Sequence, residues 1–343
     1  MFKLANYKIF VFSPLFLTNY YNTMNIIKRS FLMMIMTLVT IVVAAQSVED
    51  AGAKYNEGNE LYKEKAYSSA VTSYEEALNI AIAVGVDAED LKSSIEKQLM
   101  NAYYKNGLQY KSIGLDAAIA SLEKAYALAE QLGDDKMKTK SAINIAKFRS
   151  GKGNSLLKKN KLDEAFAEYE MALEIQPTCV NAFYGMGKLY KAKNDMANMV
   201  INMDKVIEFG ADNPKAAKYV KKAKSTASKA LVTAGAKEIQ KEHGKKAAEY
   251  INQSFNYAPG NAKTYYYLAL AYNNTNNWND AITAANKAIG METEKNSEMY
   301  FALGQACEGV GNNADACAAY KNVTSGPNIE VAKYQITQVL KCN

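Results

Sequence analysis

Few residues of this chain have the types and spacing that enzymatic chemistry requires. His243 is the only histidine, and we find around it no partners at the helical or loop spacing of a metal site or a catalytic pair. The chain also lacks the motifs G-x-S-x-G, H-E-x-x-H, G-x-x-x-x-G-K-S/T and C-x-x-C. Nothing here supports an enzyme, a metal site or a cofactor, and we expect His243 to be a solvated loop residue.

Four cysteines, Cys179, Cys307, Cys317 and Cys342, are the other residues with distinctive chemistry. Disulfides are permitted if the protein is exported. Which cysteines can meet depends on the elements that carry them.

Those elements repeat along the chain. Gly153, Ala165, Tyr169, Ala172 and Pro177 stand at offsets of 0, 12, 16, 19 and 24. Residues at i, i+4 and i+7 share one face of a helix, and proline ends a helix. The spacing predicts two antiparallel helices that cross closely where Gly153 faces Ala165.

The same spacing recurs in six further segments: Gly58–Ala70–Tyr74, Ala118–Leu122–Ala125, Gly187–Met199–Met203, Gly235–Ala247–Ile251, Ala269–Ala281–Ala285 and Gly304–Ala316–Tyr320. Successive second helices are separated by 34 or 35 residues in three steps and by 47 or 48 in the other three. The additional 13 or 14 residues are close to four helical turns. We therefore expect longer helices, rather than long loops, in segments 86–112, 137–150 and 214–230.

This pattern resembles the tetratricopeptide repeat, whose period is about 34 residues, over residues 51–325. The resemblance implies an all-α fold, a right-handed superhelical solenoid of about seven antiparallel helix pairs whose first helices line a concave groove. We expect the solenoid over residues 46–327 and a C-terminal capping helix over residues 328–343. The apolar side of that cap is predicted to carry Ile329, Val331, Tyr334, Ile336 and Val339.

The cap suggests a partner for one cysteine. Cys317 follows Ala316 at a position that is apolar in other repeats, so it should face the cap. Antiparallel packing brings the end of the cap, with Cys342, beside Cys317. We predict a Cys317–Cys342 disulfide that clamps the cap; a Cys307–Cys317 bond and four free thiols are the alternatives.

The resemblance also implies a binding surface, because ligands of this family contact first-helix positions on both sides of the Gly or Ala site. Those positions carry aromatic, amide and lysine side chains: Tyr55, Asn59, Tyr62, Asn154, Lys158, Tyr184, Lys188, Lys191, Tyr266, Asn273 and Phe301. Rings give contact area at low entropic cost and amides satisfy backbone groups, so this lining suits an extended peptide. The alternative is that the tyrosines only pack neighbouring helices. The family's carboxylate-gripping set is not matched at Ser150, Asn154, Gly185 and Thr233, so specific capture of a peptide C-terminus is not expected.

Residues 24–45 have the three parts of an export signal. Lys28 and Arg29 form a basic start, an apolar run extends from Phe31, and Val43-Ala44-Ala45 forms a small-residue cleavage site. The apolar run is shorter than the about 20 residues of a membrane-spanning helix. We expect a cleaved signal over residues 1–45, with an uncleaved anchor as the alternative.

Two further expectations follow from this signal. Met24 is the expected start, with residues 1–23 as a gene-model extension; the alternative is an unusually long basic region. The exported protein would lie in the periplasm or be secreted, with no integral membrane span once the signal is removed.

The charge of the chain argues against nucleic acid as a partner. Without residues 1–45, which carry four basic residues and no acid, the formal net charge falls from +6 to +2. Such a chain generates no global field toward nucleic acid, and Arg149 is its only arginine outside the signal. Residues 215–246 hold ten lysines against Glu238 and Glu242. They either meet an acidic partner or, as we favour, form a solvated helix face.

These features favour a protein-interaction scaffold in the cell envelope that binds peptide segments or partner proteins through the concave groove. The alternative is a periplasmic chaperone-like holdase for envelope proteins. A scaffold should retain one or two stoichiometric partners, whereas a holdase should suppress the aggregation of unrelated clients.

The export signal gives a first testable prediction. N-terminal sequencing of the protein from its native host should begin at or near Gln46. A protein that retains Met24–Ala45 would show that the segment is an uncleaved anchor.

Overall fold

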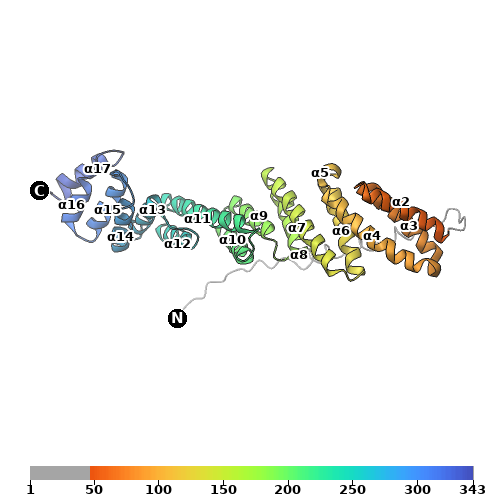
Figure 1. Ribbon diagram of the computed structural model, residues 1–343. Helices are drawn as coiled ribbons and strands as arrows, with labels where there is room; N and C mark the ends of the chain where they lie inside the picture. Colours follow the sequence, from red (N-terminus) through yellow and green to blue (C-terminus); the bar gives the residue numbers. More distant parts are fainter. Residues whose placement is uncertain (1–46, 343) are drawn as a thin grey trace, which may run out of the picture.

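The computed structural model describes residues 47–342. The predicted export signal and the expected N-terminal residue Gln46 lie outside the described residues. Figure 1 shows the helices following one another in chain order along an elongated row, with the first pair at one end and the C-terminus at the other. Within the described residues, no helix is both long and apolar enough to cross a membrane.

Seven consecutive helix pairs make up this row in the part of the chain that the structure describes. They are α2 (Val48–Lys63) with α3 (Tyr67–Val84), α4 (Glu89–Leu108) with α6 (Leu115–Gln131), α7 (Asp135–Lys158) with α8 (Leu162–Ile175), α9 (Val180–Ala192) with α10 (Met196–Gly210), α11 (Ala217–Gln240) with α12 (Gly244–Ser254), α13 (Ala262–Asn273) with α14 (Trp278–Ile289), and α15 (Ser297–Gly309) with α16 (Asn313–Tyr320). Two short helices lie in the connections: η1 (Gly85–Ala88) between the first and second pairs, and α5 (Tyr110–Ile113) between α4 and α6. The predicted all-α solenoid of helix pairs is confirmed.

The additional residues of the longer repeats lengthen first helices, as predicted. The first helices α7 and α11 have 24 residues each and α4 has 20, whereas α9 and α15 have 13. Figure 1 shows α11 as a long helix in the middle of the row. Because four turns add nearly a whole number of rotations, the lengthened helices keep the same face toward their neighbours.

The close crossing between α7 and α8 has a different nearest side chain from the predicted one, although in two other pairs the backbone oxygen of the predicted alanine, Ala118 or Ala247, does lie within 3.0 Å of a Cβ added to the glycine. A Cβ added to Gly153 would lie 2.6 Å from ring atom Cε1 of Tyr169, so the nearest side chain is Tyr169 rather than Ala165. Gly58 meets Tyr74 and Gly304 meets Tyr320 in the same way. The glycine leaves room for a ring that comes from the second helix sixteen residues later. Each of these three tyrosines is almost fully buried.

Other repeats fill the same gap with aliphatic side chains. Gly187 is covered by Met203 and Gly235 by Ile251, again sixteen residues later. In the second repeat Gly107 meets Leu122, fifteen residues later. The contact therefore persists even where the sequence pattern weakens.

The turn inside each pair has its own regularity. The residue seven positions after the small first-helix residue has a positive φ in every repeat: Lys65, Gly114, Asn160, Asn194, Glu242, Asn276 and Gly311. In six repeats this residue follows the end of the first helix and lets the next backbone N–H bond to one of its last carbonyls, as Ala66 N does to Leu61 O at 2.9 Å. In the second repeat α5 lies between α4 and Gly114, which directly precedes α6. Lysine and glutamate rarely adopt this conformation, so Lys65 and Glu242 are held there by the packing of the pair.

The last segment covers the end of the row. It consists of α17 (Ile329–Tyr334) and a π-helical stretch, Gln335–Val339. The residues that pack on the last repeat are the buried Ala332 and the partly buried Ile336 and Leu340. The predicted apolar side is wrong for Val331, Tyr334 and Val339, which are exposed by 47–59%. A terminal helix has one neighbour only, so a narrow stripe at a spacing of four is all that it buries.

The disulfide predicted between Cys317 and Cys342 is present in the structure, with Cα atoms 5.8 Å apart. It joins α16 to the residues that follow the π-helical stretch. Cys307 is buried and Cys179 partly buried, and both are free thiols.

The glycine–ring contact predicts opposite effects for two glycines of α7. Gly153→Ala should lower the free energy of unfolding by about 1–3 kcal/mol, because the new methyl group would overlap the Tyr169 ring. Gly151→Ala is the matched control, since nothing lies within 4 Å of its added Cβ; it should raise stability by about 0.5–1 kcal/mol through helix propensity alone. Urea unfolding monitored by circular dichroism measures both. Equal effects at the two sites would contradict the contact.

The disulfide makes a separate prediction. Reduction should remove about 3 kcal/mol of stabilisation, since the bond closes a loop between residues 25 apart. Peptide mapping without reduction should recover the linked Cys317 and Cys342 peptides, with Cys307 and Cys179 as free thiols. Recovery of free Cys317 and Cys342 would exclude the bond.

Candidate functional site

The candidate groove residues all lie on first helices, and neighbouring first helices touch along the row, α7 with α9, α9 with α11, α11 with α13 and α13 with α15. The helices thus bring side chains from successive repeats to one surface. That surface divides into an N-terminal aromatic part, a central basic part and several clefts further along.

The N-terminal part is built from α2. The Tyr55 ring lies 5.9 Å from that of Tyr74, and the Tyr62 ring lies 5.2 Å from that of Tyr67. The hydroxyl of Tyr74 donates a hydrogen bond to Oδ1 of Asn59 at 2.8 Å. Tyr55, Asn59 and Tyr62 are half-buried, so they pack against neighbours while keeping one edge exposed, whereas Tyr74 is buried in the core. The side-chain oxygen of Asn59 is therefore already occupied by the hydrogen bond from Tyr74, which belongs to the core.

The central part gathers Asn154, Tyr184 and Lys188 from two successive repeats. Asn154 Oδ1 accepts from the hydroxyl of Tyr169 at 3.2 Å and from Nζ of Lys188 at 2.5 Å. Lys188 Nζ lies 5.2 Å from the centre of the Tyr184 ring, which in turn contacts Tyr219 of α11 at 5.8 Å between ring centres. The buried ring of the core is thus linked through one amide to the groove surface.

Positive charge accumulates around Lys188 without compensation. Burial, followed by the charges of Lys158 and Lys222, lowers the pKa of Lys188. No carboxylate of the described residues forms an ion pair with these three lysines. An anionic group on a ligand would relieve this repulsion, because it would favour the charged form of Lys188.

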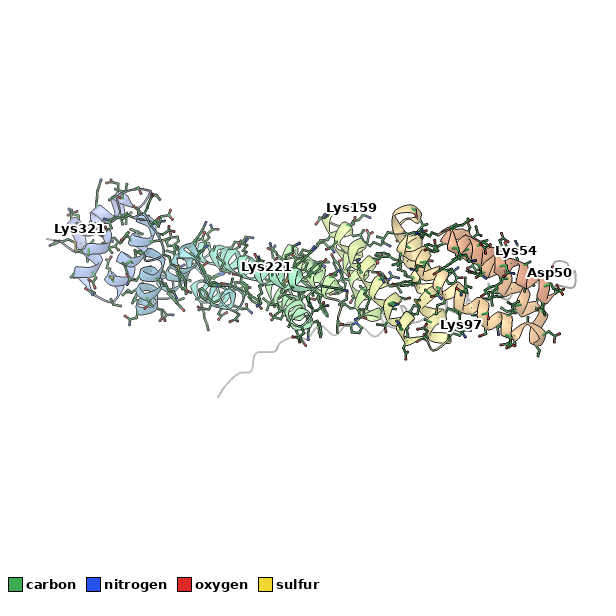
Figure 2. The ribbon with its side chains drawn as sticks, viewed as in Figure 1. Asp50, Lys54, Lys97, Lys159, Lys221 and Lys321 are labelled. Carbon is green, nitrogen blue, oxygen red and sulfur yellow. A yellow bond between two sulfur atoms is a disulfide. The ribbon has the colours of Figure 1, made fainter. Side chains whose placement is uncertain are left out.

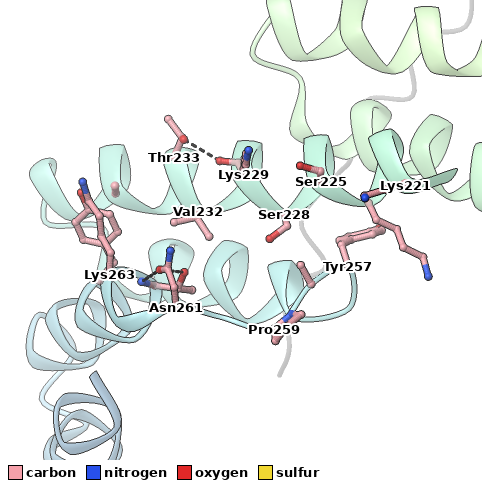
Figure 3. Close-up of a pocket in the computed structure, with 15 residues that line it drawn as sticks. Lys221, Ser225, Ser228, Lys229, Val232, Thr233, Tyr257, Pro259, Asn261 and Lys263 are labelled. Carbon is pink, nitrogen blue, oxygen red and sulfur yellow. Dashed lines mark hydrogen bonds between the residues drawn. The ribbon is translucent and has the colours of Figure 1, made fainter. Parts of the chain in front are cut away.

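A cleft lies next to this region, along α11. Lys221 marks its position near the middle of the row (Figure 2). The cleft has a volume of about 740 Å³ and lies between α11 and the turn that leads from α12 into α13 (Figure 3). Its cationic side chains are Lys221, Lys224, Lys229 and Lys263, and neither aspartate nor glutamate lines it.

Two tyrosines and a proline give this cleft its apolar wall. Figure 3 shows Tyr257 and Pro259 on the opposite side of the cleft from Val232 of α11, and Tyr267 also lines the cleft. Tyr257 is held in place because its hydroxyl donates to Oδ1 of Asp204 at 2.7 Å. Burial, followed by that hydrogen bond, raises the pKa of Tyr257, so its hydroxyl remains a donor. The wall is therefore rigid, while the lysines around it are free of ion pairs within the described residues.

This α11 cleft was not predicted as a site from the sequence. The basic stretch 215–246 was interpreted as a solvated helix face, and groove positions were counted only from Gly235. The four added turns of α11 lie before that glycine. Lys221, Ser225, Ser228 and Val232 recur at intervals of three or four, and this helical spacing was the signal available.

Lys191 and His243 belong to a separate charged cluster. Lys191 lines a cleft of about 480 Å³ with residues of α11 and α12. Its centre is Glu238, which contacts His243 Nδ1 at 2.8 Å and Lys241 Nζ at 3.0 Å. His243 is an exposed residue between α11 and α12, as expected, but it has a partner, Glu238, five residues earlier, which the sequence analysis did not predict. The histidine and lysine contacts lower the pKa of Glu238, and the arrangement is an ordinary ion-pair cluster.

The remaining predicted residues lie toward the C-terminus. Tyr266 lines a cleft of about 430 Å³ between α11, α13 and α15, and burial raises its pKa to about 12. Asn273 and Phe301 meet in a further cleft beside the cap. Lys158 is exposed on the last turn of α7.

Within the described residues, no group of three or more histidine, cysteine, aspartate or glutamate side chains is arranged to hold a metal ion. The surface offers rings, amides and unpaired lysines. Its chemistry is that of recognition, by stacking, hydrogen bonding and charge.

Comparison with known proteins agrees with this architecture. A family model described as "TPR repeat" matches residues 153–194, and one described as "Tetratricopeptide repeat" matches residues 266–328. A search of curated proteins found no match.

Several solved structures are similar to this chain. MamA (residue 41 to the end) from Desulfovibrio magneticus RS-1 is 20% identical, with 57% of this chain and 97% of that chain covered and a TM-score of 0.33. A tetratricopeptide repeat protein from Parabacteroides merdae ATCC 43184 is 16% identical, with coverage of 85% and 99% and a TM-score of 0.28. YrrB, described as a TPR protein with an unusual peptide-binding site, is 17% identical, with coverage of 60% and 95% and a TM-score of 0.36. Identities and TM-scores this low give no information about function.

The repeated spacing, the consecutive helix pairs and the two family matches lead to one assignment: the chain is a tetratricopeptide-repeat protein.

Proposed function

We propose that this protein is a non-enzymatic scaffold of the cell envelope that binds an extended, acidic segment of a partner protein along its first helices. The tetratricopeptide-repeat architecture itself supports protein binding. The observation that carries the finer proposal is the α11 cleft, where four lysines without acidic partners surround a wall of aromatic rings.

The chemistry of the cleft selects the partner. An extended segment can lay apolar side chains against Tyr257 and Tyr267 while its carboxylates meet the lysines at the rim. Groups that pair with Lys221, Lys224 or Lys229 displace only water, since no internal ion pair must first be broken. The half-buried Lys188 and its neighbours extend the same preference for anions toward α9.

Two features support a location in the envelope. Residues 24–45 have the composition of an export signal, and a Cys317–Cys342 disulfide suits an oxidising compartment. The chaperone-like alternative shares this location but requires no defined groove.

Site-specific crosslinking in intact cells tests the proposal. A photoreactive phenylalanine analogue at Val232, inside the α11 cleft, should trap one or two defined partners, which mass spectrometry then identifies. The same analogue at Ile82, exposed by 57% on the second helix α3, is the positional control and should trap none of them. Equal trapping of many unrelated proteins at both positions would favour the holdase instead.

Charge reversal tests the role of the lysines. The double variant Lys221→Glu/Lys224→Glu should reduce the crosslink at Val232 about ten-fold, since like charges would then meet at the rim. Lys97→Glu/Lys147→Glu changes the net charge equally on α4 and α7 but leaves the cleft unaltered, and it should have no effect. If the two double variants behave alike, the cleft does not select an acidic segment.

A further inference from the structure

A second cleft, beside the cap, has the opposite chemistry to the α11 cleft. It has a volume of about 400 Å³ and lies between α13, α15 and the π-helical stretch. Each of these elements contributes a polar side chain: Asn273 from α13, Glu308 from α15 and Gln335 from the π-helical stretch. Trp278 and Phe301 supply aromatic rings, and neither lysine nor arginine lines the cleft.

Two of the residues that line this cleft, Asn273 and Gln335, carry amide oxygens that are buried without a hydrogen-bond donor. The Nδ2 group of Asn273 donates to the backbone oxygen of Ala302 at 3.0 Å, which fixes the direction of the amide. Its Oδ1 atom has no partner, and neither has the Oε1 atom of Gln335. Unpaired buried acceptors are costly, so a site that keeps two of them in one cleft is prepared for a donor from outside.

The third acceptor is a carboxylate. Glu308 Oε2 accepts from the hydroxyl of Tyr320 at 2.8 Å, and no cation of the described residues forms an ion pair with it. Burial, followed by this hydrogen bond, raises the pKa of Tyr320, so the hydroxyl remains a donor rather than a competing anion. Glu308 is half-buried, and a carboxylate in that environment gains much from a cation that donates hydrogen bonds.

The rings complete the preference. Trp278 is packed against Gly309, where an added Cβ would overlap the indole, so the ring has a fixed position at the edge of the cleft. Aromatic faces attract organic cations, and tryptophan does so most strongly. Acceptors that need donors, an unpaired carboxylate and fixed rings are all features that a guanidinium or alkylammonium group satisfies.

We infer that this cleft, formed by Asn273, Trp278, Phe301, Glu308 and Gln335, binds a basic side chain, lysine or arginine, of the partner protein. The inference rests on the proposed function for the identity of the partner, but the site itself is defined by its own acceptors and rings. The groove would then bind oppositely charged groups of the partner at two places: acidic groups along α11 and a basic group beside the cap. Such a pair of sites fixes the direction of a bound segment.

The chain contains a direct reporter of this site, because Trp278 is its only tryptophan. We would titrate the full mature protein with n-butylguanidinium and n-butylammonium and follow tryptophan fluorescence, with uncharged N-butylurea as the neutral probe. The two cations should give a saturable change, and N-butylurea at the same concentrations should bind about ten-fold more weakly or not at all.

Glu308→Gln tests the carboxylate while keeping an acceptor for Tyr320, and it should weaken binding of both cations about ten-fold. Glu330→Gln is the matched control, since Glu330 is exposed and pairs only with Lys333; it should bind like the unaltered protein. Gln335→Leu should also weaken binding, and circular dichroism checks that each variant is folded. A fluorescence response that is absent, equal for N-butylurea, or unchanged in Glu308→Gln would overturn the inference. These probes do not involve the α11 cleft, so failure here is separate from failure of the crosslinking experiment.

Discussion

The contact between a first-helix glycine and a ring of the second helix is the constraint on which this structure depends. Gly153 and Tyr169 show its form: the missing side chain lets the ring fill the crossing, and the ring is then almost fully buried. Tyr169 also lies against Gly185 of the next repeat, so the same ring sets the distance within one pair and between two pairs. Where the ring is replaced by Met203, Ile251 or Leu122, an aliphatic chain fills the same gap. The contact determines how the first helices line up, and the first helices carry the proposed binding surface.

The link from core to groove is short. The hydroxyl of Tyr169 reaches Asn154, and Asn154 in turn holds Lys188 at the surface, so a groove cation is positioned by the same residue that fills the core. The hydroxyl of Tyr320 likewise reaches Glu308 of the cleft beside the cap. A ring that is selected for packing therefore also orients the polar groups that meet a ligand. A tyrosine can serve both purposes because its phenol ring is apolar and carries a polar hydroxyl at its far end.

Much of the fold could be predicted from the sequence because small and aromatic residues recur at fixed offsets, as in Gly153 and Tyr169. The offsets show which residues share a face, but they do not show which of them fills the crossing, and so Ala165 was assigned a contact that Tyr169 makes. The positive φ of the turn residue can be predicted where the residue is Asn160 or Gly311, because asparagine and glycine favour this conformation. It cannot be predicted at Lys65 or Glu242, where packing overrides the local preference. The candidate site was less accessible to prediction. Asn273 and Phe301 follow from their repeat positions, whereas Trp278 joins them through its packing against Gly309 of α15 and Gln335 only through the docking of the cap. Lys221 and its neighbours lie on the added turns of α11, which are not part of the repeat pattern.

The disulfide at one end of the row gives the molecule a mechanical polarity. Each repeat is held chiefly by its neighbours, so opening begins at an end rather than in the middle. At the N-terminal end, α2 is held mainly by α3 and α4. At the other end, a covalent bond ties the cap to α16. Under a load applied along the row, we therefore expect α2 to detach before the cap, which is tied to α16 by a covalent bond. The proposed cleft beside the cap lies at the end of the molecule that carries this covalent tie.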